Sequence, residues 1–150
     1  AQDVVEITFD EDTFTIIEYV PLGLNDKTSY YPLEKQTLRF HDNGYYKIDR
    51  DFLFEPPEFN TKMLYHIYNA NSALLNKLQK GQLLNDRELK DLENLPSTLM
   101  ICYLNGFDDA KQKLIDAKAV LKPFPQVYLS FKEALRILRK MKYDGQSAAN

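Results

Sequence analysis

Residues 36–60 read QTLRFHDNGYYKIDRDFLFEPPEFN, and the character of the chain changes within them. Strand-favouring residues flank Asn43-Gly44, a dipeptide that accommodates the two positive φ angles of a type I′ turn. This pattern predicts a β-hairpin with strands over 36–42 and 45–54. Glu55-Pro56-Pro57-Glu58 then interrupts the chain, and beyond it the apolar period changes from two to about 3.6. We therefore expect strands before this segment and helices after it.

The residues upstream predict another hairpin. Apolar and polar residues alternate over 5–9 and again over 14–20, on either side of the acidic link Asp10-Glu11-Asp12. Pro21-Leu22-Gly23 is expected to end the second strand, because proline cannot donate a hydrogen bond to a strand ladder. A polar loop is then expected to run to about Pro32.

The downstream residues predict about five helices. The first is expected over 60–79, and the second is a short helix that begins with the capping box Asn85/Glu88. The third is an apolar helix over 97–105, and the fourth is capped by Asp108. The last is expected to run from the capping box Ser130/Glu133 to about Lys142. The predicted fold is α+β, with two N-terminal β-hairpins in an antiparallel sheet followed by a helical bundle. We expect a single domain over 1–143, mainly β over 1–58 and mainly helical over 59–143, and a flexible tail over 144–150.

Composition excludes several classes of protein. The chain has 150 residues, 44% of them hydrophobic, which is enough for one core without disulfides or a structural metal. Its single cysteine excludes an intrachain disulfide scaffold and a cysteine-based zinc module. No run of apolar residues is long enough to predict a transmembrane helix. An N-terminal Ala1-Gln2 is compatible with signal cleavage, initiator removal or artificial truncation, so location stays open, with an intracellular one slightly favoured.

Charge is distributed unevenly along the chain. Residues 1–59 carry 13 acidic and 5 basic side chains, whereas residues 60–150 carry 9 acidic and 14 basic ones. The favoured interpretation is that the two halves lie against each other and partly neutralise each other. The alternative is that each half meets a different partner.

No pattern in the sequence indicates catalysis, a metal or a cofactor. The five glycines stand apart, so neither a P-loop nor a dinucleotide-binding loop is present. His41 and His66 lack the spacing of a metal pair, and Cys102 lies in the most apolar predicted helix, where burial would keep it inert. We therefore predict no catalytic residues, no metal ligands and no cofactor.

Tyrosines are the most informative candidates for binding. Tyr45 and Tyr46 adjoin the predicted turn, and adjacent strand residues point to opposite faces, so one of them is expected to face away from the core. Tyr30-Tyr31 is expected in the loop between the hairpins, where it would join the same patch. Exposed tyrosine is enriched in recognition surfaces, although strand propensity explains most of these aromatic residues equally well.

The last predicted helix is amphipathic, with an apolar arc that includes Leu135 and Leu138. The opposite arc is basic and contains Lys132, Arg136, Arg139 and Lys140. This arc is either a solvated face of a docked helix or a contact for phosphates, an anionic membrane or an acidic surface.

Three hypotheses for function follow. The leading one is a non-catalytic interaction or assembly module that binds a protein partner through the tyrosine-bearing hairpin surface. An alternative is a nucleic-acid-binding module that uses the basic arc, with tyrosines as stacking platforms. A third hypothesis is a small hydrolase built around His41 and neighbouring carboxylates.

Overall fold

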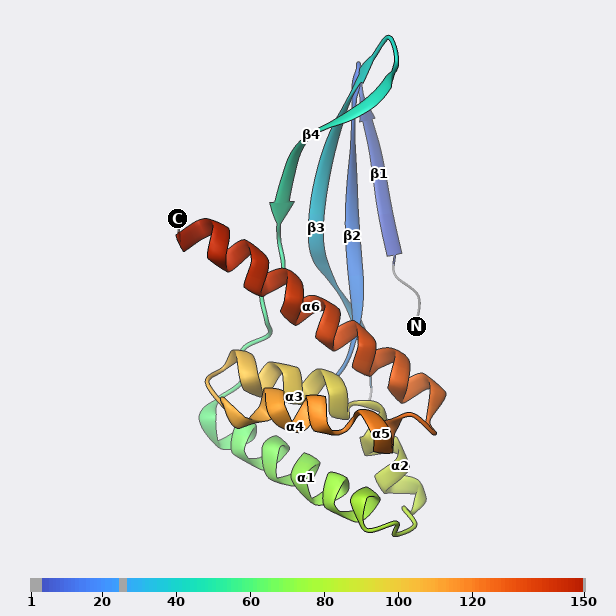
Figure 1. Cartoon of the computed structure of the whole chain (residues 1–150), viewed down its shortest axis with the longest axis vertical. Coiled ribbons are helices and arrows are strands. Elements are labelled where there is room, and N and C mark those ends of the chain that lie inside the picture. Colours follow the sequence, from blue (N-terminus) through green and yellow to red (C-terminus); the bar gives the residue numbers. More distant parts are fainter. Residues whose placement is uncertain (1–3, 25–26, 150) are drawn as a thin grey trace.

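The computed structural model describes residues 4–24 and 27–149 and shows a four-stranded sheet standing on a helical bundle (Figure 1). All strand pairs are antiparallel, and the order in the sheet is β1-β2-β3-β4. The strands are β1 (Val4–Asp10), β2 (Thr13–Leu24), β3 (Lys27–His41) and β4 (Gly44–Phe52). Ala1-Gln2, residues 25–26 of the expected loop and Asn150 of the expected tail lie outside the described residues.

Within the described residues, six helices follow the sheet. They are α1 (Thr61–Gln79), α2 (Asp86–Glu93), α3 (Leu95–Leu104), α4 (Asp109–Asp116), α5 (Lys118–Leu121) and α6 (Pro125–Ala149). This arrangement confirms the predicted α+β class, with strands first and helices after them. Helix α2 begins with the expected capping box, in which Asn85 and Glu88 each accept from the other's backbone N–H.

The loop expected between the hairpins was wrong, because β2 and β3 are longer than predicted. Strand β2 continues to Leu24 and β3 begins at Lys27. Pro21 and Pro32 are tolerated because each lies where its strand has lost one neighbour. Strand β1 pairs with β2 only as far as Tyr19, and β4 pairs with β3 only from Glu34 onward. Because no described neighbouring strand lies on that side, the missing N–H of proline costs no hydrogen bond between strands there.

The turn of the second hairpin also differs from the expected type I′ turn. His41 pairs with Gly44, so the two turn residues are Asp42 and Asn43 rather than Asn43 and Gly44. Gly44 has a φ of 127°, whereas Asn43 has no positive φ. The glycine therefore supplies the unusual backbone angle from the first position of β4.

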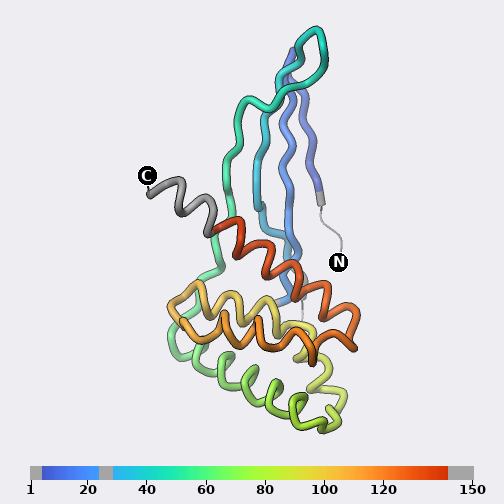
Figure 2. Tube along the Cα trace, viewed as in Figure 1, coloured from blue at the N-terminus to red at the C-terminus, as the bar shows by residue number. Residues whose placement is uncertain are grey.

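The core lies in the helical layer, where α3 is sandwiched between α1 and α6 (Figure 2). Seven residues of α3, which contains the most apolar predicted helix, are buried. They are Leu95, Pro96, Ser97, Leu99, Met100, Ile101 and Cys102. A further row of buried residues, Ala110, Leu114, Ala117 and Leu121, runs over α4 and α5.

Helix α6 is longer than predicted at both ends. It begins at Pro125, because proline is favoured in the first turn of a helix, where its missing N–H costs nothing. Ser130 therefore lies inside the helix, and the predicted Ser130/Glu133 capping box was wrong. Asp108 stands before α4 as expected, but its side chain makes no capping hydrogen bond. At the other end, the backbone of α6 continues past Lys142 to Ala149.

Only the lower end of the sheet reaches the core. Val20, Leu22 and Leu33 are buried there against the helices, and Phe54 joins them just after β4. The upper part of the sheet, with both hairpin turns, extends well away from the helices (Figures 1 and 2). Every described residue of β1 from Val5 to Asp10 is exposed.

Candidate functional site

The projecting part of the sheet has one apolar face. Directly opposed residues of antiparallel strands point to the same face, so the register assigns each side chain to a side. Ile7, Ile16 and Gln36 form one row, and Phe9, Phe14 and Leu38 form the next. Phe40 and Tyr45 oppose each other on the same side. We call this surface the apolar sheet face and define it as Val5, Ile7, Phe9, Phe14, Ile16, Leu38, Phe40 and Tyr45.

Four of these residues form a continuous aromatic cluster. The ring centroids of Phe9 and Phe14 are 5.6 Å apart, those of Phe14 and Tyr45 are 4.5 Å apart, and those of Phe40 and Tyr45 are 5.2 Å apart. The two Tyr45 contacts are edge-to-face, a favourable geometry for aromatic rings. Phe9 nevertheless remains 73% exposed, and Phe40 and Tyr45 are each 50% exposed. The cluster is ordered by its own contacts but is not covered by any described part of the chain.

The opposite face of the same strands is polar. Its rows include Thr8, Thr15 and Thr37, followed by Asp49. The sheet is therefore amphipathic in the way expected of a sheet packed on one side. In this protein, however, the apolar side of the upper sheet faces solvent.

A buried carboxylate marks the lower boundary of the apolar sheet face, where α6 crosses the sheet. Glu34 has a side chain only 3% exposed, and its Oε2 lies 2.9 Å from Arg50 Nη2 and 2.9 Å from Lys140 Nζ. Gln36 Nε2 donates to Glu34 Oε1 at 2.8 Å. Burial by itself raises the pKa of this carboxyl. The hydrogen bonds from Arg50, Lys140 and Gln36 lower the pKa by a larger amount, so its net value falls from the usual 4.5 to about 2. Glu34 is therefore ionised and holds α6 against β3.

A second ion pair lies beside it. Arg136 of α6 contacts Glu18 of β2 and also Glu133 of its own helix. Together with Glu34–Lys140, this pair joins the acidic first half of the chain to the basic second half. The two halves thus lie against each other, as the charge asymmetry predicted.

The predicted basic arc is consequently only partly solvated. Arg136 and Lys140 are in ion pairs with the sheet, which corrects the expectation that all four cations lie in solvent. The Lys132 Nζ lies 5.2 Å from the centroid of the Tyr128 ring. Arg139 is exposed. The apolar arc opposite is docked as expected, with Leu138 buried and Leu135 half-buried.

The four predicted tyrosines do not form one patch. Tyr45 lies on the apolar sheet face, whereas Tyr46 lies on the polar face, with its ring 5.4 Å from that of His41. Both are about half exposed because the helices do not reach this end of the sheet. Tyr30 and Tyr31 lie in the far half of β3, about 30 Å away along the strand.

Those two tyrosines also differ from each other. Tyr30 is 49% exposed, whereas Tyr31 packs against the core and contacts the Phe54 ring.

The two residues considered for catalysis lie in different parts of the fold. His41 is exposed at the hairpin tip, and Cys102 is buried in α3, where burial raises the pKa of its thiol to about 11. No group of three or more metal-ligating side chains occurs within residues 4–24 and 27–149. His66 lines a hollow of about 490 Å³ between α1 and α2, whose wall includes the ion pair Lys77–Glu88.

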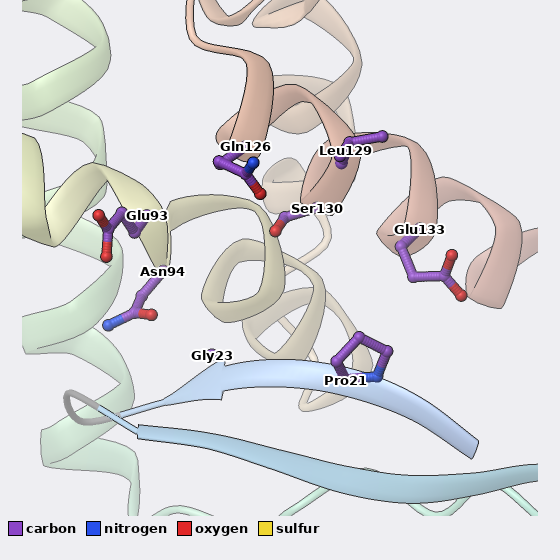
Figure 3. Close-up of a pocket in the computed structure, with 8 residues that line it drawn as sticks. All are labelled: Pro21, Gly23, Glu93, Asn94, Gln126, Leu129, Ser130 and Glu133. Atoms are coloured by element: carbon purple, nitrogen blue, oxygen red, sulfur yellow. The ribbon is translucent and has the colours of Figure 1, made fainter. Parts of the chain in front are cut away.

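Another hollow of about 320 Å³ lies between β2, the junction of α2 and α3, and the first turns of α6 (Figure 3). Asn94 closes one side, and a Cβ on Gly23 would lie only 2.4 Å from Asn94 Oδ1, so glycine permits this close approach. Ser130 and Glu133 line the other side. The described lining residues include no histidine or cysteine; its hydroxyl and carboxylate groups come from Ser130, Glu93 and Glu133.

The fold and its surface define a class of protein: an α+β domain whose antiparallel sheet projects from a helical bundle and exposes an apolar face. The chain belongs to the family described as "Domain of unknown function (DUF5929)", whose model matches residues 1–144. No curated protein and no solved structure matches the chain. Within the described ranges, no helix has the length and hydropathy needed to cross a bilayer.

Sequence reasoning identified Tyr45 but missed Phe9, Phe14 and Phe40, which surround it. The available signal was the alternation that places Val5, Ile7 and Phe9 on one side of a strand. That signal gives the apolar side of a strand but not whether another element covers it.

Proposed function

We propose that this protein is a non-catalytic interaction module that binds a protein partner through the apolar sheet face. The observation that carries this proposal is the aromatic cluster of Phe9, Phe14, Phe40 and Tyr45, which is held in place by ring contacts yet remains open to solvent. Large, ordered and exposed apolar patches are characteristic of binding surfaces, because leaving them in water is unfavourable.

The size of the surface supports this function. An aromatic side chain presents about 150–250 Å² for burial, so the exposed parts of Phe9, Phe40 and Tyr45 amount to roughly 350 Å². Val5 and Ile7, each 52% exposed, extend the same surface. The total is comparable with the largest apolar patch on a typical monomer, about 300–600 Å², which is often functional.

The chemistry of the surface favours a protein over a nucleic acid. The apolar sheet face offers rings and aliphatic side chains, which match the apolar centre of a protein interface. The alternative nucleic-acid site needs free cations on α6, but Arg136 and Lys140 are already paired with Glu18 and Glu34. No observation favours the hydrolase hypothesis, because His41 stands at an exposed hairpin tip.

Site-specific photo-crosslinking in the cells that make the protein tests this function. Benzoylphenylalanine would replace Tyr45 in one variant and Tyr46 in a matched control, since these neighbours are similarly exposed but lie on opposite faces. We expect a discrete adduct with another protein from position 45 and little from position 46. An adduct pattern that is equal at both positions, or stronger at position 46, would exclude the apolar sheet face as the binding surface.

A further inference from the structure

The two edges of the sheet differ in how they are protected. Edge strands expose unpaired backbone groups, and proteins usually block them with charges, prolines or bulges. Strand β4 carries such features, because its register with β3 shifts between Thr37 and Leu38 and its exposed residues include Lys47 and Asp49. Strand β1, with the sequence VVEITFD, carries the charges Glu6 and Asp10 but has no proline, no lysine and no register shift along its pairing with β2.

The outward edge of β1 also presents backbone N–H and C=O groups that could pair with another strand. The Phe40 N–H donates to the Asp12 carbonyl at 2.7 Å, so the backbone groups of Asp12 point toward β3. Along β2, residues alternate between bonding toward β3 and bonding toward β1. Because that alternation has a period of two, Thr13 and every second residue after it bond toward β1. The backbone groups of Val5, Ile7 and Phe9 then point away from β2. Among the described residues, β1 has no second neighbour to receive them.

We propose that this edge pairs with β1 of a second copy of the chain, antiparallel, about a two-fold axis at Ile7. This register uses all seven residues of β1. It places Val5 opposite Phe9 of the other copy, apolar against apolar, and Glu6 opposite Thr8, without a like-charge pair. The strand is therefore complementary to itself.

Neighbouring registers are less favourable. An axis at Glu6 would place the two Glu6 carboxylates directly opposite each other. An axis at Thr8 would place Glu6 opposite Asp10 of the other copy. If one strand slid by one residue along the other, apolar side chains would stand opposite polar ones, because successive side chains of a strand point to opposite faces.

The paired assembly is a continuous eight-stranded sheet with a two-fold axis perpendicular to it. Such an axis keeps both apolar sheet faces on the same side of the sheet. The pairing concerns the edge of the sheet rather than its face, so it stands independently of the proposed partner.

Engineered disulfides test both the pairing and its register. We expect Ile7→Cys to give a covalent dimer under mild oxidation, because the two cysteines would face each other across the axis. Phe9→Cys alone should give no covalent dimer under the same conditions, since the two copies of residue 9 would be about 14 Å apart along the strands. Asp49→Cys is the matched control on the other edge, and it should not crosslink. Native Cys102 is buried and does not compete.

The unmodified chain provides a second readout that does not depend on any substitution. Sedimentation equilibrium should show a mass rising with concentration toward twice 17.5 kDa. A mass that stays at 17.5 kDa up to about 1 mM protein overturns the proposal, because the edge would then be left open or reserved for a different strand. A dimer that crosslinks through Tyr45→Cys but not through Ile7→Cys also overturns it, because that pattern indicates packing of the two faces.

Discussion

Leu138→Ala is expected to lower the free energy of unfolding by about 2–5 kcal/mol. Leu138 is only 6% exposed and belongs to the core cluster with Leu99 and Phe131, so its truncation removes buried contacts and leaves a cavity. Because α6 packs on α3 and also holds the sheet through Arg136 and Lys140, loss of this anchor weakens the connection between the two layers. Denaturant titration of the purified variant measures the change.

Leu135→Ala is the matched comparison on the same helix. Leu135 is only half-buried, so its truncation should cost less than that of Leu138. Equal, negligible losses for both variants would show that α6 is not docked through its apolar arc.

Acidification is expected to destabilise the protein through Glu34. Its carboxyl has a pKa of about 2 in the folded state, against a usual 4.5, so the ionised form stabilises the fold above pH 4.5. That stabilisation is lost as the pH falls from 4.5 toward 2, because the unfolded chain then takes up the proton more readily. Its magnitude is about 3 kcal/mol, since each unit of pKa difference corresponds to about 1.4 kcal/mol.

Glu34→Gln isolates this contribution from that of the other carboxyls. The variant should be less stable than the wild type near neutral pH and should show a smaller loss of stability between about pH 6 and pH 2, measured by denaturant titration at each pH. Glu55→Gln removes an exposed carboxylate and should leave the pH dependence close to that of the wild type. A wild-type slope in Glu34→Gln would contradict the role assigned to Glu34.

Local patterns predicted much of the fold. The Pro56-Pro57 interruption marks the change from strands to helices, and Asn85 and Glu88 fix the start of α2, because both signals act through neighbouring backbone groups. Signals that depend on distant neighbours were misleading. Pro21 predicted a strand end, yet it is tolerated where β1 no longer lies alongside β2.

The proposed binding surface was only partly predictable for a related reason. Strand β3 has 15 residues and is about 50 Å long, and the helices run across the lower end of the sheet instead of along its strands (Figure 1). The helices therefore cover one end of the sheet and leave Phe9 and Tyr45 uncovered. Alternation in sequence gives the apolar side of each strand, but the position of the helices along the sheet is set only in the assembled fold. The same holds for Arg136, whose acidic partner Glu18 lies more than a hundred positions away in the sequence.

The affinity of the crosslinked partner for two single variants tests the central claim most directly. Tyr45→Ala should weaken binding by about 1–3 kcal/mol, or roughly 5- to 150-fold in Kd, because it removes the ring that joins Phe14 and Phe40 on the apolar sheet face. Tyr46→Ala, on the polar face, should leave Kd close to that of the wild type once both values are corrected for folded fraction. An unchanged Kd for Tyr45→Ala, together with a large loss for Tyr46→Ala, would contradict the assignment of the apolar sheet face as the binding surface.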